Sequence, residues 1–257
     1  MIENGYRPHE QSGGKGTSAG SAGFAVGSAS ARLSGARLST ALYEAVKERL
    51  LEGRYAAGEK IVVEALREEF GVSKQPVMEA LRRLSSDHLV RIIPQVGCEV
   101  ARYSPQEVED FFLLFGGTEG AIAAVAAVRR TEAQLHQLRQ MTDSADHLVD
   151  SIDPRDRARG YLAHNRKFHA AIHVMAHSRI MVETSQRLWD MSDFLISTAG
   201  LDNPLADAIP HRQRDHHEIL DAIADQDALA ARQAMEGHIT GTIQIIRDGG
   251  APPDATD

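Results

Sequence analysis

Hydrophobic residues recur every three or four positions along most of this chain, a spacing typical of amphipathic helices. From residue 104 onward no stretch alternates as a strand does, so we expect an all-α antiparallel bundle of six or seven helices. The helices expected from this spacing span residues 105–128, 131–149, 156–176, 179–199, 212–224 and 228–247. The pair Gly116-Gly117 inside the first of them marks either a kink or a close helix–helix approach. Residues 1–35 and 249–257 lack an apolar period and are expected to be disordered tails.

A helix-turn-helix pattern lies in the earlier part of the chain. It is preceded by a helix expected over about residues 38–53. The apolar face of the next expected helix is formed by Ile61, Ala65 and Leu66. Gly71 suits the left-handed residue that ends such a helix, and Ser73 is a good N-cap for the helix that follows. This spacing predicts two short helices joined by a tight turn.

Two runs that favour strands, Leu89–Ile93 and Cys98–Ala101, come next and flank a turn with proline and glycine. Helix, tight turn, helix and hairpin in this order predict a winged helix-turn-helix, whose second helix enters the DNA major groove. The predicted fold class is therefore mainly α. An N-terminal winged helix-turn-helix at 36–103 is followed by the helical bundle at 104–248.

The net charge of −8 argues at first against binding to nucleic acid, but the charges are unevenly distributed. Residues 36–104 hold 11 Lys/Arg and 10 Asp/Glu, whereas residues 105–257 hold 14 and 24. The N-terminal domain must therefore gather its basic side chains on one face if it binds DNA. The single cysteine, Cys98, excludes an intrachain disulfide. With no signal peptide and no apolar run of membrane-spanning length in view, we expect a cytoplasmic protein with no membrane partner.

The helix-turn-helix segment resembles the GntR family of bacterial transcription regulators over about residues 38–101. The residues that match are Gly53, Ala57-Gly58, Gly71-Val72-Ser73, Pro76-Val77, Glu79-Ala80-Leu81-Arg82-Arg83-Leu84 and Gly97. The resemblance implies that the chain binds a double-stranded DNA operator as a homodimer. The residues that we expect to contact DNA are Ser73, Lys74, Gln75, Pro76, Arg82, Arg83 and Gly97.

The chain departs from this family at several positions that contact DNA. The family usually has arginine where this chain has Glu64, Lys74, Met78 and Val96, and glycine where it has His88. Only Lys74 keeps the positive charge. One alternative reading is therefore a ligand-binding module whose contact with DNA is weakened.

Four polar residues in the bundle could meet on different helices. Asn165 and His169 are four residues apart and share one helical face. His216 and His238 lie in the last two expected helices, each flanked by apolar residues at helical spacing. Helical bundles build metal sites from inward-facing residues of this kind.

These residues and their neighbours resemble the FCD ligand-binding domain of the FadR subfamily, over about residues 106–247. The resemblance rests on Asn165…Phe168-His169, on Asp215-His216…Ile219-Leu220-Asp221-Ala222-Ile223 and on Met235…His238-Ile239. It implies that Asn165, His169, His216 and His238 hold a divalent metal ion, with zinc or nickel as the leading candidates. It also implies a small organic acid effector in a pocket around the metal, which His173 could line. The family often has arginine at the position of Phe115.

Other interpretations of the histidines are open. A single histidine in a bundle is more often a core or surface residue, and this reading is favoured for the histidines outside the set of three. The same set with an open position would also suit a metal-dependent hydrolase. That alternative leaves the winged domain unexplained. No carboxylate close in sequence to these histidines is an obvious general base.

Overall fold

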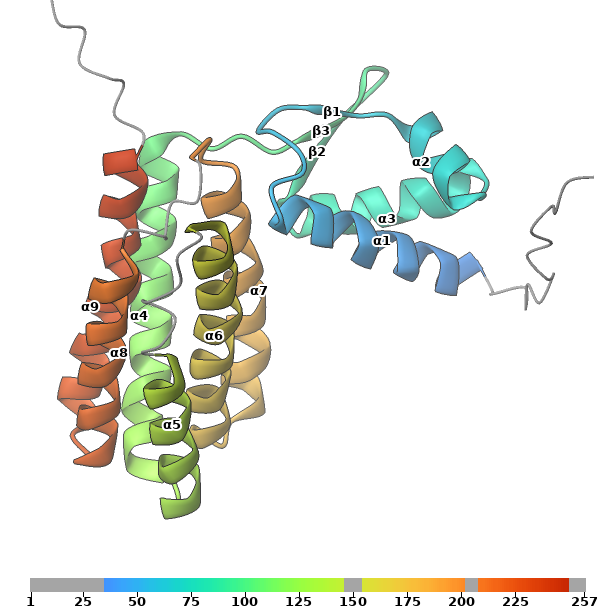
Figure 1. Ribbon diagram of the computed structural model, residues 1–257. Coiled ribbons are helices and arrows are strands. Elements are labelled where there is room, and N and C mark those ends of the chain that lie inside the picture. The colour runs from blue at the N-terminus through green and yellow to red at the C-terminus, as the bar shows by residue number, and fades with distance from the viewer. Residues whose placement is uncertain (1–34, 146–153, 202–207, 250–257) are drawn as a thin grey trace, which may run out of the picture. The chain divides into compact units, whose positions relative to one another are not determined.

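The structure, a computed structural model, describes residues 35–145, 154–201 and 208–249. A winged helix-turn-helix is followed by a helical bundle, which confirms the predicted fold class (Figure 1). The elements of the N-terminal domain are α1 (Gly35–Leu51), β1 (Lys60–Ile61), α2 (Val63–Phe70), α3 (Lys74–Ser86), β2 (Val90–Ile93) and β3 (Gly97–Val100). The elements of the bundle are α4 (Pro105–Arg129), α5 (Glu132–Ala145), α6 (Pro154–Met175), α7 (Arg179–Ser197), α8 (Ile209–Ala224) and α9 (Ala228–Gly249). The two predicted tails fall almost entirely outside the described residues.

The N-terminal domain is built on α3, against which α1 and α2 both pack. The side chains buried between these helices include Leu42, Val46, Leu66, Val77, Leu81 and Leu84. Gly71 ends α2 with φ 63° and ψ 36°, the left-handed conformation that was predicted for it. Ser73 precedes α3 in an extended conformation, but its side chain makes no capping hydrogen bond. The hydroxyl of Ser73 is therefore left exposed at the beginning of α3.

The sheet has the antiparallel order β1-β3-β2. Strands β2 and β3 form the predicted hairpin, with Val90 opposite Val100. The placement of Ile61 on a helical face is wrong, because Ile61 pairs with Cys98 of β3 and α2 begins only at Val63. A strand of two residues has no hydrophobic period, so only its distant partner determines where it forms.

Helix α4 begins with a capping box. Glu107 N–H donates to Ser104 Oγ at 3.3 Å, and Ser104 N–H donates to Glu107 Oε2 at 2.7 Å. Further along, α4 packs closely against α9. A Cβ on Gly116 would lie 3.1 Å from Thr240, and one on Gly120 would lie 2.6 Å from Glu236. Of the two alternatives for the glycine pair, a close helix–helix approach is therefore correct for Gly116. Gly120 makes a second close contact one turn later.

Helix α4 is also long and apolar enough, by length and composition alone, to cross a membrane, with a mean hydropathy of 1.8 over its most apolar window. This corrects the expectation that no segment reaches that length. Half of the window is buried inside the protein. The apolar composition of α4 is accounted for by its place in the bundle core, where Phe112 and Ile122 are fully enclosed.

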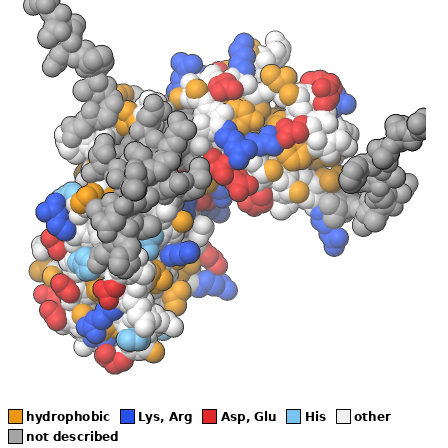
Figure 2. All heavy atoms as spheres, in the orientation of Figure 1, with side chains coloured by type: hydrophobic (Ala, Val, Ile, Leu, Met, Phe, Trp, Pro, Cys, Tyr) orange, Lys and Arg blue, Asp and Glu red, His pale blue; other side chains and the backbone are white. Residues whose placement is uncertain are grey.

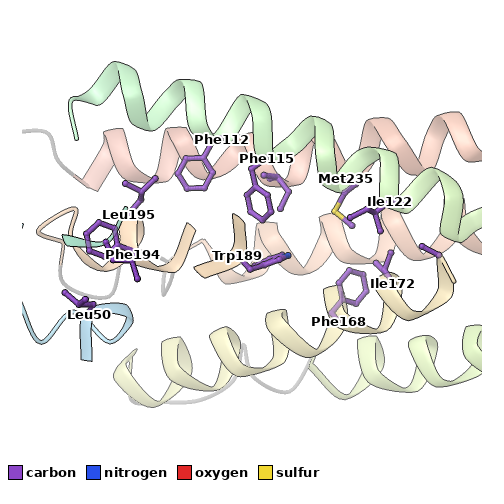
Figure 3. Close-up of a cluster of buried hydrophobic side chains, with 14 of the residues drawn as sticks. Leu50, Phe112, Phe115, Ile122, Phe168, Ile172, Trp189, Phe194, Leu195 and Met235 are labelled. Atoms are coloured by element: carbon purple, nitrogen blue, oxygen red, sulfur yellow. The ribbon is translucent and has the colours of Figure 1, made fainter. Parts of the chain in front are cut away.

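The core of the bundle is formed by side chains from all six of its helices, and Figure 3 shows several of them. Its members include Phe112, Phe115 and Ile122 of α4, Phe168 and Ile172 of α6, Trp189 of α7 and Met235 of α9. Phe115 and Trp189 meet edge to face with ring centroids 5.1 Å apart. This core fixes α6, α8 and α9 at the level where their polar residues turn inward.

Candidate metal centre and DNA-binding helix

The four residues predicted as metal ligands come together in the bundle. Asn165 and His169 project from α6, His216 from α8 and His238 from α9. All four are buried, and the three histidines are at most 1% exposed. One ring nitrogen from each histidine lies within 4.8 Å of the other two. Apolar neighbours such as Ile219 and Ile239, which are buried in the core, turn these histidines inward by helical spacing.

The donor atoms lie at short distances from one another. His169 Nε2 is 3.3 Å from His238 Nε2, and His216 Nε2 is 3.0 Å from Asn165 Oδ1. Two nitrogen ligands at about 2.0–2.1 Å from one zinc ion would lie roughly 3.0–3.4 Å apart. The observed spacing therefore fits ligands that share one ion. The ring of His216 is held by Phe168, which stacks on it with centroids 4.1 Å apart.

Two carboxylates orient the outer nitrogens of these rings. His238 Nδ1 lies 3.1 Å from Asp215 Oδ2, so Nδ1 carries the proton and Nε2 presents its lone pair to the centre. His169 Nδ1 faces Glu119 Oε2 at 3.6 Å. That distance is too long for a hydrogen bond, but the carboxylate still favours a proton on Nδ1. Two lone pairs that face each other at 3.3 Å repel unless a cation or a shared proton lies between them.

The buried histidines are neutral at physiological pH. Burial lowers the pKa of His169 to about 4, although Glu119 opposes this effect. Burial also lowers the pKa values of His216 and His238 well below their usual range, and nearby positive groups add to the effect. Neutral imidazole is the form that binds transition metals. The centre is therefore ready to bind a metal without first releasing protons from these rings.

A second polar cluster lies directly behind His169. Glu119 is 1% exposed, and its Oε2 is 2.9 Å from His173 Nε2. Ser185 donates its hydroxyl proton to Oε1 of the same carboxylate. Burial by itself would raise the pKa of Glu119, but its interactions with His169 and His173 lower it to about 2. His173 thus supports the charged carboxylate behind the centre and does not join the group of ligand atoms.

The sequence did not point to Arg212 in α8, whose side chain reaches the same centre. Arg212 Nη2 is 3.1 Å from His238 Nε2, and Nη1 donates to the carbonyl oxygen of His238. Arg212 is four residues before His216, the spacing that also joins Asn165 to His169. This spacing was the available signal, because residues four apart share one helical face.

The residues expected to contact DNA lie on or near α3 and do not form one uniform set. Lys74, Gln75 and Arg82 are exposed, and so is Gly97 at the wing turn. Pro76 is buried. Arg83 lies over the ring of Tyr43 at 4.0 Å and donates to Thr40 at 3.2 Å, so it holds α3 against α1. Of the residues expected to contact DNA, Ser73, Lys74, Gln75 and Arg82 have exposed side chains.

The positions at which the family usually carries further arginines have other partners here. Glu64 forms an ion pair with Arg67 at 2.6 Å, and Met78 packs against the domain core. Val96, at the wing turn, is 66% exposed. Figure 2 shows basic and acidic side chains interspersed over the face of this domain that is in view.

Two families match this chain, one over each part. Residues 38–100 match "Bacterial regulatory proteins, gntR family", and residues 118–241 match the "FCD domain". The chain is 25% identical over 215 residues to the HTH-type transcriptional repressor GlaR of Escherichia coli K12, covering 80% of this chain and 94% of GlaR. It is 27% identical over 218 residues to the Uxu operon regulator of Haemophilus influenzae, covering 79% of each.

A solved structure shows the same fold. Escherichia coli McbR/YncC aligns over 82% of this chain and 97% of its own, with a TM-score of 0.65 at 20% identity. This likeness extends through both the helix-turn-helix and the bundle.

Proposed function

This chain belongs to the bacterial regulatory proteins of the gntR family and carries an FCD domain, and from that premise we propose a specific regulatory mechanism. A homodimer binds a DNA operator through its winged domains at 36–103. Each helical domain, at 104–248, holds one divalent metal ion and a small organic acid. Binding of the acid shifts the balance between two dimer geometries that present α3 differently to DNA. The protein acts in the cytoplasm and has no membrane partner.

The single observation that carries this proposal is the convergence of His169, His216 and His238 in neutral form. Imidazole nitrogen suits zinc and nickel, which are the proposed ions. Asn165 offers a neutral carbonyl oxygen as the fourth ligand. A divalent ion held by four neutral ligands keeps its full charge, so it attracts an anion such as a carboxylate.

The proposed contact with DNA uses the side chains around α3. Lys74, Gln75 and Arg82 are exposed and can reach base edges or phosphates. The exposed hydroxyl of Ser73 and the backbone at Gly97 are proposed to contact phosphates. Pro76 and Arg83 are assigned a supporting role, because Pro76 is buried and Arg83 holds α3 against α1.

The proposed homodimer forms through the outer face of α4. Leu113 and Leu114 are 60% and 65% exposed, and Ile180 of α7 is 77% exposed. These residues, with Gly117 and Ala121, line one shallow depression. Gly117 is half-buried, and a glycine within a helix costs about 1 kcal/mol relative to alanine, a cost that close approach of a second helix would offset. The occupant proposed for this face is therefore α4 of a second copy.

Metal content is the first test of this function. Full-length protein purified without chelator is expected to hold about one zinc or nickel ion per chain by mass spectrometry. His216→Ala should lose most of it, whereas His136→Ala, which removes an exposed histidine of α5, should not. Metal content in His216→Ala equal to that of the unaltered protein would contradict the metal assignment.

Regulation is tested separately by fluorescence anisotropy. The DNA fragments are taken from the region upstream of the gene that encodes this protein. Tight binding to one fragment, with steep weakening by salt and a change on addition of chelator, is expected. Equal, weak binding to all fragments would support a second function, in which the chain is a ligand-binding module with little DNA contact.

That second function is favoured by the residues that replace the family's arginines. Val96 is the best position to examine, because it is exposed at the wing and a longer side chain disturbs no core. Val96→Arg should raise DNA affinity several-fold if the missing arginine limits binding. The hydrolase alternative has no support, because the named relatives are transcription regulators and this chain is a regulator of the same family.

A further inference from the structure

Arg212 is a buried cation that lies close to the hydroxyl of Tyr161 and uses only part of its hydrogen-bonding capacity. The residue is 4% exposed and lies in the first turn of α8. Its Nη1 donates to the carbonyl oxygen of His238, and its Nη2 contacts His238 Nε2 at 3.1 Å. Among the described residues its Nε has no hydrogen-bond partner. Since a guanidinium has five donors and is costly to bury, this arrangement indicates a missing acceptor.

The nearest carboxylate does not supply that acceptor. Asp215 Oδ2 is 3.9 Å from Arg212 Nη1, beyond hydrogen-bond distance, and it accepts the Nδ1 proton of His238 instead. Glu119, a buried carboxylate of the same region, is engaged by His173 and Ser185. Among the described residues, the guanidinium therefore has no carboxylate within hydrogen-bond distance.

Arg212 and a metal ion would compete for the same atom. With its proton on Nδ1, His238 has one lone pair on Nε2, which can accept from Arg212 or bind a metal but cannot do both. A bound metal would therefore release Nη2 from His238. The N–H groups of Nη2 and Nε would then be free and parallel, so they could donate to the two oxygens of one carboxylate.

The charges around the centre also call for one anion. A divalent ion and Arg212 together carry three positive charges, and Glu119 and Asp215 carry two negative ones. One further negative charge would neutralise the group, and a monocarboxylate supplies it. A second carboxylate on the same ligand would introduce negative charge that the described residues do not balance.

We propose that Arg212 is the residue that binds the carboxylate of the effector, beside the metal, and that this favours monocarboxylates over dicarboxylates. The inference rests on the proposed function, because it places the acid at the metal centre. Phe115 stands where the family often has an arginine, and it is buried against Trp189 with no donor to offer.

The test uses full-length protein loaded with Co²⁺, whose visible absorption reports on its ligands. Acetate, glycolate and malonate are titrated into the unaltered chain, Arg212→Gln, Arg212→Lys and Arg214→Gln. Arg214 is an exposed arginine on the same helix and provides the matched control. Circular dichroism and calorimetry on each variant measure folding and the dissociation constants.

Acetate or glycolate should change the cobalt spectrum of the unaltered chain and of Arg214→Gln alike, with malonate binding more weakly. Arg212→Gln should keep the cobalt spectrum in the absence of acid but bind the monocarboxylates roughly ten- to a hundredfold more weakly, as expected for lost hydrogen bonds to a charged group. Arg212→Lys keeps the charge but loses the paired donors of the guanidinium. Its affinity for the monocarboxylates should lie between those of the unaltered chain and Arg212→Gln. If Arg212→Gln does not fold, the weaker binding of Arg212→Lys carries the test.

Three results would overturn the inference, and they are distinguishable. Unchanged monocarboxylate affinity in both Arg212 variants would show that Arg212 does not bind the carboxylate. The proposed function would be unaffected by that result. A failure of the unaltered chain to take up Co²⁺ would overturn the metal site. Uptake of Co²⁺ without a response to any of the three acids would overturn the carboxylate effector and Arg212 with it.

Discussion

The exposed end of α3 and the enclosed centre of the bundle place functional side chains in opposite surroundings. Lys74 and Gln75 stand in solvent, whereas His216 and His238 are at most 1% exposed. A side chain in water can change with little effect on folding. A buried polar side chain must have its partners or it destabilises the protein by about 1–3 kcal/mol. The difference predicts that function and stability are separable in the winged domain and coupled in the bundle.

The largest expected effect is in the aromatic core that supports the centre. Phe115→Ala should lower the free energy of unfolding by about 3–5 kcal/mol, because it leaves a cavity against Trp189. Val128→Ala, on the exposed side of the same helix, should change it by less than about 0.5 kcal/mol. Denaturant titration measures both. A loss below about 1 kcal/mol for Phe115→Ala would mean that the core around the centre is loosely packed.

Glu119→Gln tests the coupling between the centre and its supporting carboxylate. The variant keeps the shape but removes the charge that faces His169 and binds His173. Zinc affinity, measured by competition with a chelator, should fall about 10- to 100-fold. Glu183→Gln, an exposed position on α7, is the control and should leave it unchanged. Equal zinc affinity in Glu119→Gln and the unaltered chain would show that the carboxylate does not orient His169.

Gly120→Ala tests the close contact of α4 with α9, the helix that carries His238. A Cβ there would lie 2.6 Å from the Glu236 side chain and 3.0 Å from the backbone oxygen of Arg232. Overpacking of this kind should cost about 1–3 kcal/mol of unfolding free energy. Gly117→Ala meets no described atom within 4 Å and should stabilise the monomer by up to about 1 kcal/mol. Thermal unfolding at low protein concentration compares the two, and a greater loss in Gly117→Ala would contradict this assignment.

Lys74→Gln should have the smallest effect on the fold. DNA affinity should weaken about equally on all fragments, and the slope of log affinity against log salt should fall by about 1 if Lys74 contacts a phosphate. The free energy of unfolding should change by less than about 0.5 kcal/mol, because Lys74 is exposed. A marked loss of stability in Lys74→Gln would contradict the difference drawn between the exposed end of α3 and the enclosed centre of the bundle.

Local patterns were enough to predict most of the elements. The glycine at 71 ends α2 in the predicted conformation, and the capping box at Ser104 begins α4. Both signals act within a few residues, so they can be read directly from the sequence. Strand β1 was missed because Ile61 owes its conformation to Cys98, which is distant in the chain.

Some residues of the candidate site could likewise be predicted from the sequence, and others could not. The structure brings together Asn165 and the three histidines named from the family resemblance, although their role as ligands stays a prediction. Arg212 could not be assigned from sequence alone, because an arginine near the beginning of a helix is usually exposed. Only the packing of α8 against α9 shows that it is enclosed beside His238.

The close packing of α4 against α9 has a consequence for synthesis in the cell. These helices are the first and last of the bundle, so the contact that joins them must wait until almost the whole chain has left the ribosome. The core of the winged domain forms where α1 and α2 pack on α3, and all three helices are made before the bundle helices. It is expected to fold while the chain is still being made, and the bundle only after release.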